Sequence, residues 1–334
     1  MSQRLVLVTG GAGFIGINLC RFLLARGFAV RVLDTAPPIT HGDLEVVHGD
    51  VCDPRRVEHA MRGVSYVVHA AAGAASSPSE EIFSTNVTGT WTVLQAVLRN
   101  RPERFVYLSS TAVYGAQSHH LMGESDPLHG TGAYAESKIE AEHLCESARL
   151  SGTCISILRL TSVVGPARRG MFAKLYERAF AGKTLPTLGS GRNPSQTLDI
   201  EDACEAVYLC LARRAELVND TFNVGAQPSA TIRETLQAVL DRAGHGKRVI
   251  GIPAGPVTGL VRLLERSLGS RRYSWVRETA GQESYVSVRH IGVKLGFRPR
   301  YSSAAALARD YGRYARFRSN LRSIGRAEGC PELV

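Results

Sequence analysis

The stretch Arg4-Leu-Val-Leu-Val-Thr9 runs directly into Gly10-Gly-Ala-Gly13-Phe-Ile-Gly16, and a helical pattern follows it. A continuous apolar run of this length is typical of a strand buried in a parallel sheet. One helical face then repeats apolar side chains, those of Ile15, Leu19, Phe22 and Leu23. The sequence therefore predicts a strand, a tight glycine turn and a helix, in that order.

The glycine turn has the spacing of a dinucleotide site. Gly10, Gly13 and Gly16 let the backbone turn tightly and approach a pyrophosphate at the N-terminus of the helix. The next apolar run ends in Asp34, where an acidic side chain can bind the hydroxyls of the adenosine ribose. Because a carboxylate repels a 2′-phosphate, the pattern predicts NAD, and the nearby Arg31 keeps NADP as the alternative.

Length and composition indicate a globular chain. With 334 residues, 44% of them hydrophobic, it can bury the core of one large domain or of two moderate ones. No apolar stretch reaches the roughly 18 uncharged residues of a spanning helix, and no signal-cleavage pattern follows the first apolar run. The seven cysteines form no CxxC pair, which predicts reduced thiols, no metal site and a cytoplasmic location.

The positive charge is concentrated at the C-terminal end. The net charge is +10, and residues 246–334 carry 17 Lys and Arg against 6 Asp and Glu. Such an excess could attract a phosphorylated substrate, nucleic acid or an anionic membrane face. The run from Arg313 to Arg326 contains no recognised nucleic-acid module, so we favour a solvated basic helix and tail, without nucleic-acid binding or stable membrane insertion.

Strand and helix patterns alternate along the first half of the chain. Apolar runs at 28–33, 44–47, 64–68 and 104–109 are separated by helical patterns at 53–62 and 80–99, and another helix is expected at 134–150. This alternation predicts an α/β fold, a doubly wound parallel sheet of the Rossmann type with helices on both faces.

Seven motifs follow one another in order: Gly10-x-x-Gly13-x-x-Gly16, Gly49-Asp50-Val51, His69-Ala-Ala-Ala72, Asn86-Val-Thr-Gly-Thr90, Leu108-Ser-Ser-Thr-Ala-Val-Tyr-Gly115, Tyr134-Ala-Glu-Ser-Lys138 and Phe222-Asn-Val-Gly225. With them the chain resembles an extended short-chain dehydrogenase/reductase of the NAD-dependent epimerase/dehydratase family. The resemblance implies an NAD-binding domain of residues 1–165 and 196–225. It further implies a smaller, mostly C-terminal α/β substrate lobe of residues 166–195 and 226–300, then a helix and basic tail at 301–334.

A tyrosine and a lysine four residues apart carry the expected chemistry. Tyr134 and Lys138 share one helical face, so the ammonium, helped by an oxidised nicotinamide, favours the phenolate and lowers the tyrosine pKa from about 10. Tyr134 would then act as general base. The resemblance implies that Lys138 also holds the nicotinamide ribose and that Ser110 hydrogen-bonds the reacting oxygen.

The resemblance also implies further contacts to NAD. Asp50 and Val51 are expected near the adenine, the run Ala70, Ala71 and Ala72 along the pyrophosphate and ribose, and Asn86 and Ser109 beside the nicotinamide. The remaining expected cofactor contacts are Phe14, Ile15 and Thr161. Each of these residues could instead serve packing alone.

The reaction type is narrowed by residues that this chain lacks. Dehydratases of the family carry Asp and Glu directly after the catalytic hydroxyl, where this chain has Thr111 and Ala112. Elimination then lacks its acid and base, so a dehydratase is disfavoured. Sugar-nucleotide enzymes of the family have an Asn and a phosphate-binding Arg at two positions where this chain has Ser162 and Ser195. Arg192 could replace that arginine. Thr111, Ser162 and Arg192 are thus the expected substrate contacts.

Two other stretches remain open. The apolar and basic segment from Pro256 to Trp275 predicts an amphipathic helix, which could roof an apolar pocket, touch a membrane or simply pack on the substrate lobe. His119 and His120 could face the substrate, although a polar surface loop is favoured. From the resemblance we expect a homodimer that pairs the helices near 80–99 and 134–150.

Three functions are compatible with these residues. The first is an NAD-dependent enzyme that epimerises a nucleotide-linked sugar through a transient keto intermediate. The second is an NAD(P)-dependent dehydrogenase or ketoreductase of a sterol-like or secondary-metabolite alcohol, similar to 3β-hydroxysteroid dehydrogenases. The third, an NAD-sensing protein without catalysis, is disfavoured by the intact Ser110, Tyr134 and Lys138.

Overall fold

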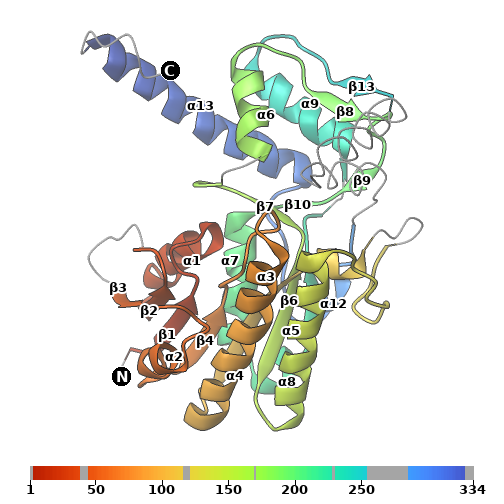
Figure 1. Ribbon diagram of the computed structural model, residues 1–334. Helices are drawn as coiled ribbons and strands as arrows, with labels where there is room; N and C mark the ends of the chain where they lie inside the picture. The colour runs from red at the N-terminus through yellow and green to blue at the C-terminus, as the bar shows by residue number, and fades with distance from the viewer. Residues whose placement is uncertain are drawn as a thin grey trace. The chain divides into compact units, whose positions relative to one another are not determined.

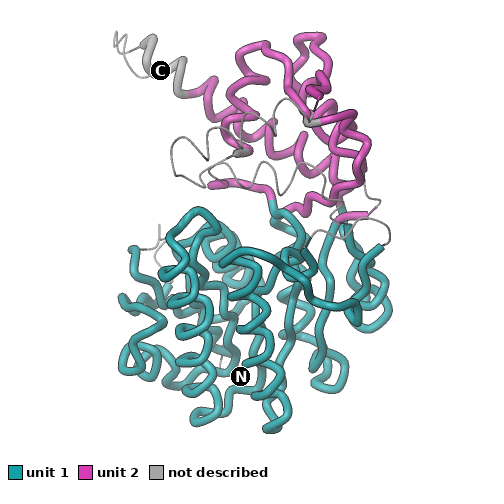
Figure 2. The backbone as a smooth tube through the Cα atoms, turned by 45° about the vertical axis from the view of Figure 1, so that its right-hand side comes forward, with its two compact units in different colours: residues 1–163, 200–225, 283–300 teal, residues 164–199, 226–282, 301–334 magenta. Residues whose placement is uncertain are grey.

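The computed structural model describes residues 3–37, 44–115, 121–168, 171–227, 230–253 and 285–327. His119, His120 and the segment from Pro256 to Trp275 lie outside these residues. The chain forms two compact units (Figure 2). Unit 1 takes its described residues from 1–163, 200–225 and 283–300, and unit 2 takes them from 164–199, 226–282 and 301–334.

Unit 1 is built on one parallel sheet of seven strands in the order β11-β6-β5-β4-β1-β2-β3. The strands are β1 (Leu5–Thr9), β2 (Ala29–Asp34), β3 (Leu44–His48), β4 (Tyr66–His69), β5 (Arg104–Ser110), β6 (Ile155–Leu160) and β11 (Thr221–Val224). The chain runs outward from β1 in one direction to β3 and in the other to β11. The strand order reverses at β1, and open α/β sheets bind ligands at the carboxyl ends of the strands beside such a reversal. The predicted Rossmann-type fold is confirmed.

Helices cover both faces of the sheet in unit 1 (Figure 1). α2, α4 and α5 form one layer, and α1 packs beside α7 on the other face. The helical segments are α1 (Phe14–Leu24), α2 (Pro54–Met61), α3 (Ser79–Phe83), the π-helical turn η1 (Ser84–Thr88), α4 (Gly89–Asn100), the 3₁₀ turn η2 (Thr111–Tyr114), α5 (Ala133–Leu150), α7 (Ile200–Ala212), α8 (Ala215–Val218) and α12 (Arg289–Leu295). A short strand, β7 (Ser162–Val164), follows β6.

The core of unit 1 lies between the central strands and the layer of α2, α4 and α5. Leu7, Val67 and Phe105 from three adjacent strands have no exposed surface and pack with Val93 and Ala141 from the helices. Burying one large apolar side chain contributes about 1.5–3 kcal/mol. The core therefore fixes the strand ends that carry the motifs.

The helix expected at 80–99 is interrupted. α3 and α4 are joined by η1, in which Asn86 is 1% exposed. The Asn86 side chain accepts a hydrogen bond from Gly73 N (2.9 Å) and donates one to Ser137 Oγ (2.9 Å). The wider π turn brings this amide inward, where it joins the loop after β4 to α5.

The described residues of 283–300 belong to unit 1, whereas the resemblance implied that this segment is part of the substrate lobe. Ile291 and Leu295 of α12 are fully or almost fully buried in this unit. Asp220, just before β11, bonds to His290 (3.0 Å) and to Lys294. Burial and these ion pairs attach α12 to the β11 side of the sheet.

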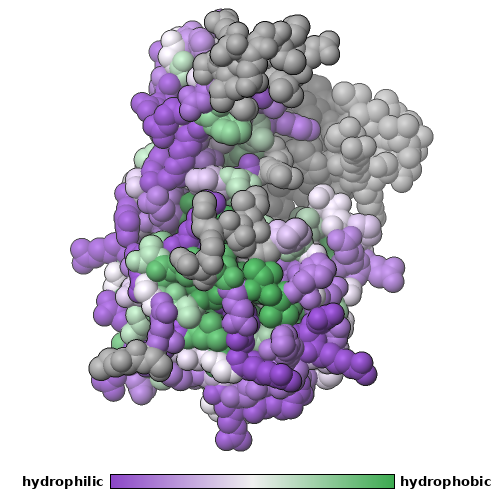
Figure 3. Space-filling model, turned by 90° about the vertical axis from the view of Figure 1, so that its left-hand side faces the viewer, coloured by the Kyte–Doolittle hydropathy of each residue, from purple (hydrophilic) through white to green (hydrophobic). Residues whose placement is uncertain are grey.

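The outer strand β3 is one edge of the sheet. Apolar residues gather on the face of the molecule that includes this edge (Figure 3), and Val46 of β3 is 42% exposed. Glu45 and His48 are also exposed on β3, and Arg31 pairs with Glu45 at 2.9 Å. Charged side chains of this kind oppose pairing of the edge with another chain.

Unit 2 is smaller and has its own core. Its elements are α6 (Met171–Phe180), β8 (Pro186–Leu188), β9 (Pro194–Ser195), β10 (Thr197–Asp199), β12 (Ala230–Thr231), α9 (Ile232–Ala243), β13 (Ile250–Ile252) and α13 (Ser303–Ala327). A capping box of Thr231 and Glu234 starts α9, and Gly244 ends it in a left-handed conformation. Ala306, Leu307 and Tyr311 of α13 are buried in this core. The C-terminal helix is therefore part of unit 2 and not a separate tail.

Candidate active site

The glycine turn lies at the carboxyl end of β1 and has almost no room for side chains. Gly10 has φ +70°, and a Cβ there would lie 2.6 Å from Ala71 N. A Cβ on Gly16 would lie 2.1 Å from Gly10 O, so α1 packs directly against the turn. Both glycines are therefore required by close backbone contacts within the protein, and these contacts set the tight turn that is typical of a pyrophosphate-binding loop.

The N-terminus of α1 suits an anion. Gly13 is the N-cap residue, and no described side chain caps this end. The first turn, which includes Phe14 and Ile15, contains no acidic residue. Amide groups and the positive end of the helix dipole therefore face the turn without a competing carboxylate, as a phosphate site requires.

Asp34 stands at the end of β2, beside the glycine turn. Its Oδ2 accepts a hydrogen bond from Ala12 N and its Oδ1 accepts one from Ala36 N, both at 2.9 Å. The carboxylate thus anchors the glycine turn, a role that the spacing alone did not reveal. Each carboxylate oxygen retains a lone pair that can accept a ribose hydroxyl.

A buried histidine supports the strand ends beneath this turn. His69 Nδ1 lies 2.7 Å from Thr9 Oγ1, and Nε2 lies 3.0 Å from Thr90 Oγ1. The ring stacks on Tyr107 with centroids 5.8 Å apart. Burial, with a smaller effect of Lys138, lowers the pKa of His69 to about 3. The histidine is therefore neutral at physiological pH and links β1, β4 and α4.

The expected catalytic residues lie on β5 and α5. Ser110 ends β5, and its Oγ accepts a hydrogen bond from Ala112 N at 3.2 Å. Tyr134 is in the first turn of α5, and Lys138 lies one turn further along the same helix. Lys138 is 2% exposed and donates through Nζ to Leu108 O (2.9 Å), which brings its ammonium to the carboxyl end of β5.

The environment of Lys138 lowers its pKa to about 8, because burial disfavours the charged ammonium. The negative charge of Glu142 acts in the opposite direction. The Nζ atom lies 4.8 Å from the centroid of the Tyr107 ring. A lysine with such a pKa can exchange a proton near neutral pH, as a proton relay requires.

We predict a pH-dependent stability effect for Lys138→Met in the cofactor-free protein. Because the folded pKa is lowered, the unfolded chain binds more protons between about pH 8 and pH 10.5, and the wild type gains stability there as pH rises. The unfolding free energy of the wild type should rise by about 2 kcal/mol relative to the variant between about pH 7 and 9.5. Urea unfolding at several pH values measures this, with the exposed Lys247→Met as a charge-matched control. A constant difference would contradict the assignment.

A network of buried polar groups joins α5 to β6. Arg159 of β6 donates to Glu142 of α5 (2.7 Å), and both side chains are at most 4% exposed. Arg159 also donates to the Tyr114 hydroxyl (2.8 Å), and Tyr114 donates to Asn223 Oδ1 (2.7 Å). Although burial alone lowers it, the hydrogen bond and charge of Glu142 raise the pKa of Arg159.

Ser109 connects this network to β5. Its Oγ donates to the Glu142 carboxylate, and Ser109 directly precedes Ser110. Glu142 is also one turn beyond Lys138 on α5. The network therefore fixes the strand and the helix that carry the expected triad. The network has no signature in the sequence, because a charged pair separated along the chain leaves no local pattern.

The other expected cofactor residues occupy different environments. Ala70 and Ala71 are half-buried after β4, and Ala72 is exposed. Asp50 accepts a hydrogen bond from Cys52 N (2.8 Å), and Val51 is only 5% exposed. The side chains of Asn86 and Ser109 form the internal hydrogen bonds given above.

Thr161, directly after β6, provides a test of whether a cofactor fits. Its backbone N donates to Val224 O (3.0 Å). Its hydroxyl is buried, and no described residue forms a hydrogen bond with it. Together with the uncapped N-terminus of α1, an unsatisfied buried hydroxyl at this edge of the sheet is compatible with a bound polar ligand. The residues present fit NAD.

The expected substrate contacts are divided between the two units. Thr111 begins η2 and is buried, and Ser162 is exposed in β7. Both belong to unit 1. Arg192 is exposed in unit 2, where its backbone N donates to Ser190 Oγ (3.3 Å). Their role in binding a substrate remains a prediction.

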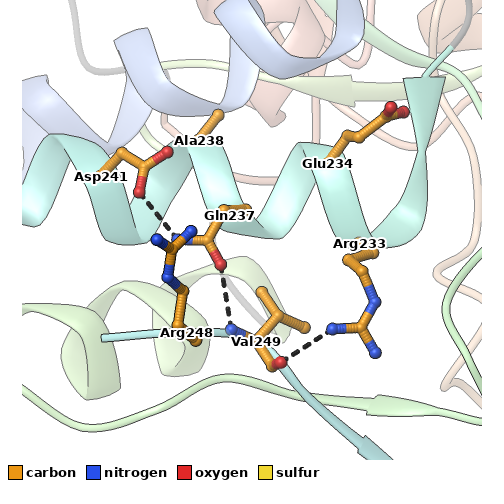
Figure 4. Close-up of a pocket in the computed structure, with 7 residues that line it drawn as sticks. All are labelled: Arg233, Glu234, Gln237, Ala238, Asp241, Arg248 and Val249. Carbon is orange, nitrogen blue, oxygen red and sulfur yellow. Dashed lines mark hydrogen bonds between the residues drawn. The ribbon is translucent and has the colours of Figure 1, made fainter. Parts of the chain in front are cut away.

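A surface recess in unit 2 contains no expected site residue. It is formed by α9 and the chain before β13 (Figure 4). Gln237 donates to Asp241 Oδ1 (2.7 Å) and accepts from Val249 N (3.0 Å), while Arg233 donates to Val249 O (2.9 Å). These polar groups attach α9 to the segment before β13, so their role is structural and they indicate no ligand.

In the part of the chain that the structure describes, no group of three or more His, Cys, Asp or Glu side chains could hold a metal ion. The described cysteines are free thiols, and Cys330 lies outside these residues. No helix of the described ranges is long and apolar enough to cross a membrane.

A seven-stranded parallel sheet with a glycine turn at β1, a carboxylate at β2 and a Tyr-Lys pair on the helix after β5 defines a dinucleotide-binding protein of the Rossmann class. The sequence model of the NAD-dependent epimerase/dehydratase family matches residues 6–225. The chain belongs to this family, which confirms the resemblance and the expectation of NAD as cofactor.

Three similar proteins illustrate the breadth of the family. "Uncharacterized protein y4nG" of Sinorhizobium fredii is 32% identical over 98% of this chain and 82% of its own length. A "3 beta-hydroxysteroid dehydrogenase/Delta 5-->4-isomerase" of Mycobacterium tuberculosis is 30% identical over 98% of this chain and 95% of its own. The crystal structure of Thermus thermophilus UDP-glucose 4-epimerase with NAD superposes with TM-score 0.75, 26% identity, and coverage of 92% of this chain and 98% of that one.

Proposed function

We propose that this protein epimerises a nucleotide-linked sugar through a transient keto intermediate. The observation that carries the proposal is the placement of Ser110 and Lys138 at the carboxyl end of β5, with Tyr134 on the same helix as Lys138. The positions after Ser110 hold Thr111 and Ala112, so no carboxyl pair is available there for elimination. Alcohol oxidation and its reversal remain as the chemistry of this site.

In the proposed reaction, Tyr134 takes the proton of the substrate hydroxyl as general base. When bound, NAD⁺ would supply the hydride acceptor for oxidation of the carbinol carbon and, once reduced, the hydride donor for the return step. Lys138 stabilises the phenolate through its positive charge, and Ser110 donates a hydrogen bond to the reacting oxygen. Asp34 and the glycine turn hold the adenosine and pyrophosphate ends of the cofactor.

A second candidate is net oxidation or reduction of a sterol-like alcohol. It is favoured by the 30% identity to the mycobacterial hydroxysteroid enzyme, which extends over 98% of this chain. It is also compatible with serine at 162 and 195, where sugar-nucleotide enzymes carry Asn and Arg. The same three catalytic residues would serve both reactions.

Cofactor balance distinguishes the two reactions. The purified protein is incubated with UDP- and dTDP-linked sugars and, separately, with sterol alcohols and NAD⁺. The proposal expects interconversion of sugar epimers without net accumulation of NADH. Stoichiometric NADH formation with an alcohol, and no conversion of any nucleotide sugar, would favour the dehydrogenase. No turnover of either class would contradict both reactions.

A further inference from the structure

The outer half of α13 presents an exposed aromatic side chain, that of Phe317, which the described part of unit 2 does not cover. In the inner half, Tyr311 is buried and its ring lies 5.8 Å from that of Tyr176 on α6. Tyr314 also packs on Tyr176, with ring centroids 5.6 Å apart. One turn later, Phe317 is 62% exposed, and the helix continues to Ala327 past α6 and α9 (Figure 1).

Positive charge surrounds this exposed phenylalanine. α13 contains six arginines and one aspartate over its 25 residues. Arg316 is exposed and Arg318 is half-buried, and neither forms an ion pair with a described residue. An exposed aromatic side chain between arginines offers two contacts to a membrane surface, an apolar one to the acyl chains and a charged one to the headgroups.

Beside this segment, α9 and α13 form an arginine-lined surface recess. Arg242 from α9 and Arg309 and Arg316 from α13 line it around Gly312. A Cβ on Gly312 would lie 3.3 Å from Arg242 Nε, so the absence of a side chain at Gly312 leaves room for this guanidinium. Arg309 also bonds Asp199 at 2.8 Å, which holds it in position. Guanidinium groups arranged in this way suit a phosphate group.

We propose that this surface, Phe317 with Arg242, Arg316 and Arg318, docks the protein on a membrane that contains anionic phospholipids. Phe317 would enter the boundary of the acyl chains, and the arginines would pair with headgroup phosphates. Charge complementarity selects this occupant, because a second copy would oppose arginine to arginine. A nucleic acid would satisfy the arginines but leave the aromatic side chain without an apolar environment. The proposal is independent of the reaction assigned to unit 1.

Sedimentation of the full-length protein with phospholipid vesicles tests the proposal. We expect binding to vesicles of phosphatidylcholine with phosphatidylglycerol, weakened by added salt, and at least about tenfold weaker binding to phosphatidylcholine alone. Arg316→Glu with Arg318→Glu should weaken binding at least about 25-fold, since each arginine near such a surface contributes about fivefold. Phe317→Ser should weaken it about tenfold.

Matched controls separate docking from general surface charge and from misfolding. Arg55→Glu with Arg62→Glu reverses two exposed arginines in unit 1, and Leu150→Ser changes an apolar residue that is 91% exposed. Both controls should bind vesicles like the wild type, and circular dichroism should match for all variants. Equal binding to neutral and anionic vesicles, equal losses in the controls, or tighter binding to duplex DNA or RNA than to vesicles would overturn the proposal. Loss of a dimer in Phe317→Ser with vesicle binding unchanged would assign the surface to a second copy instead.

Discussion

Tyr134→Phe is expected to lower the turnover rate by about 10³-fold, because a positioned general base contributes roughly 10²–10⁴-fold and phenylalanine has no proton acceptor. NAD affinity should change little, since the glycine turn, Asp34 and Lys138 remain in place. The rate is measured with whichever substrate the panel identifies, and NAD binding is measured by titration calorimetry. Tyr134 is part of α5 and only half-buried, so the ring can stay where it is when the hydroxyl is removed.

Tyr208→Phe provides the matched control for this experiment. Tyr208 lies on α7, where its ring contacts Phe22 and Phe28, on the opposite face of the sheet from α5. Its variant should keep full turnover. If Tyr134→Phe retains more than about a tenth of the wild-type rate, another group supplies the base and the assigned mechanism is wrong.

Glu142→Gln should lower the free energy of unfolding by about 3–5 kcal/mol, because it leaves the buried guanidinium of Arg159 without its counter-charge. Both side chains are inaccessible to water that could replace the lost partner. The loss should appear as a lower midpoint in urea unfolding followed by circular dichroism. The donor Ser109 also faces this carboxylate, so the carboxyl end of β5 should loosen in the variant.

Two further variants test whether charge pairing is the cause. Glu58→Gln interrupts an exposed pair with Arg99, whose side chains are 41% and 56% exposed, and should cost less than about 1 kcal/mol. Glu142→Leu combined with Arg159→Met should recover much of the stability lost in Glu142→Gln, because an apolar pair needs no desolvated charge. A loss below about 1 kcal/mol in Glu142→Gln would show that water or another group compensates Arg159.

The sheet could be predicted because each strand carries its own local signal. The apolar run before Gly10 and the one that ends at Asp34 are buried on both faces, and this produces continuous hydrophobic stretches. The glycine turn could also be predicted from the sequence, since only a residue without Cβ fits against Ala71 N or Gly10 O. Motif order then located Ser110 and Lys138 at neighbouring positions in space.

Contacts between distant positions could not be predicted in the same way. Glu142 and Arg159 are polar residues within a helix and a strand, and only the fold reveals that they neutralise each other. The π turn around Asn86 depends on amide bonds to Gly73 and Ser137, which helical periodicity does not encode. Likewise, the placement of 283–300 in unit 1 depends on the pairing of Asp220 with His290 and Lys294.

The double role of Asp34 has a consequence for cofactor engineering. Redesign toward NADP would replace this carboxylate with a neutral or basic side chain, yet the same oxygens tie down Ala12 and Ala36. Such a substitution would remove two hydrogen bonds that hold the backbone on either side of the expected diphosphate site. Successful redesign would need a compensating acceptor for these two amides. A single substitution at Asp34 should lower the affinity for both NAD and NADP.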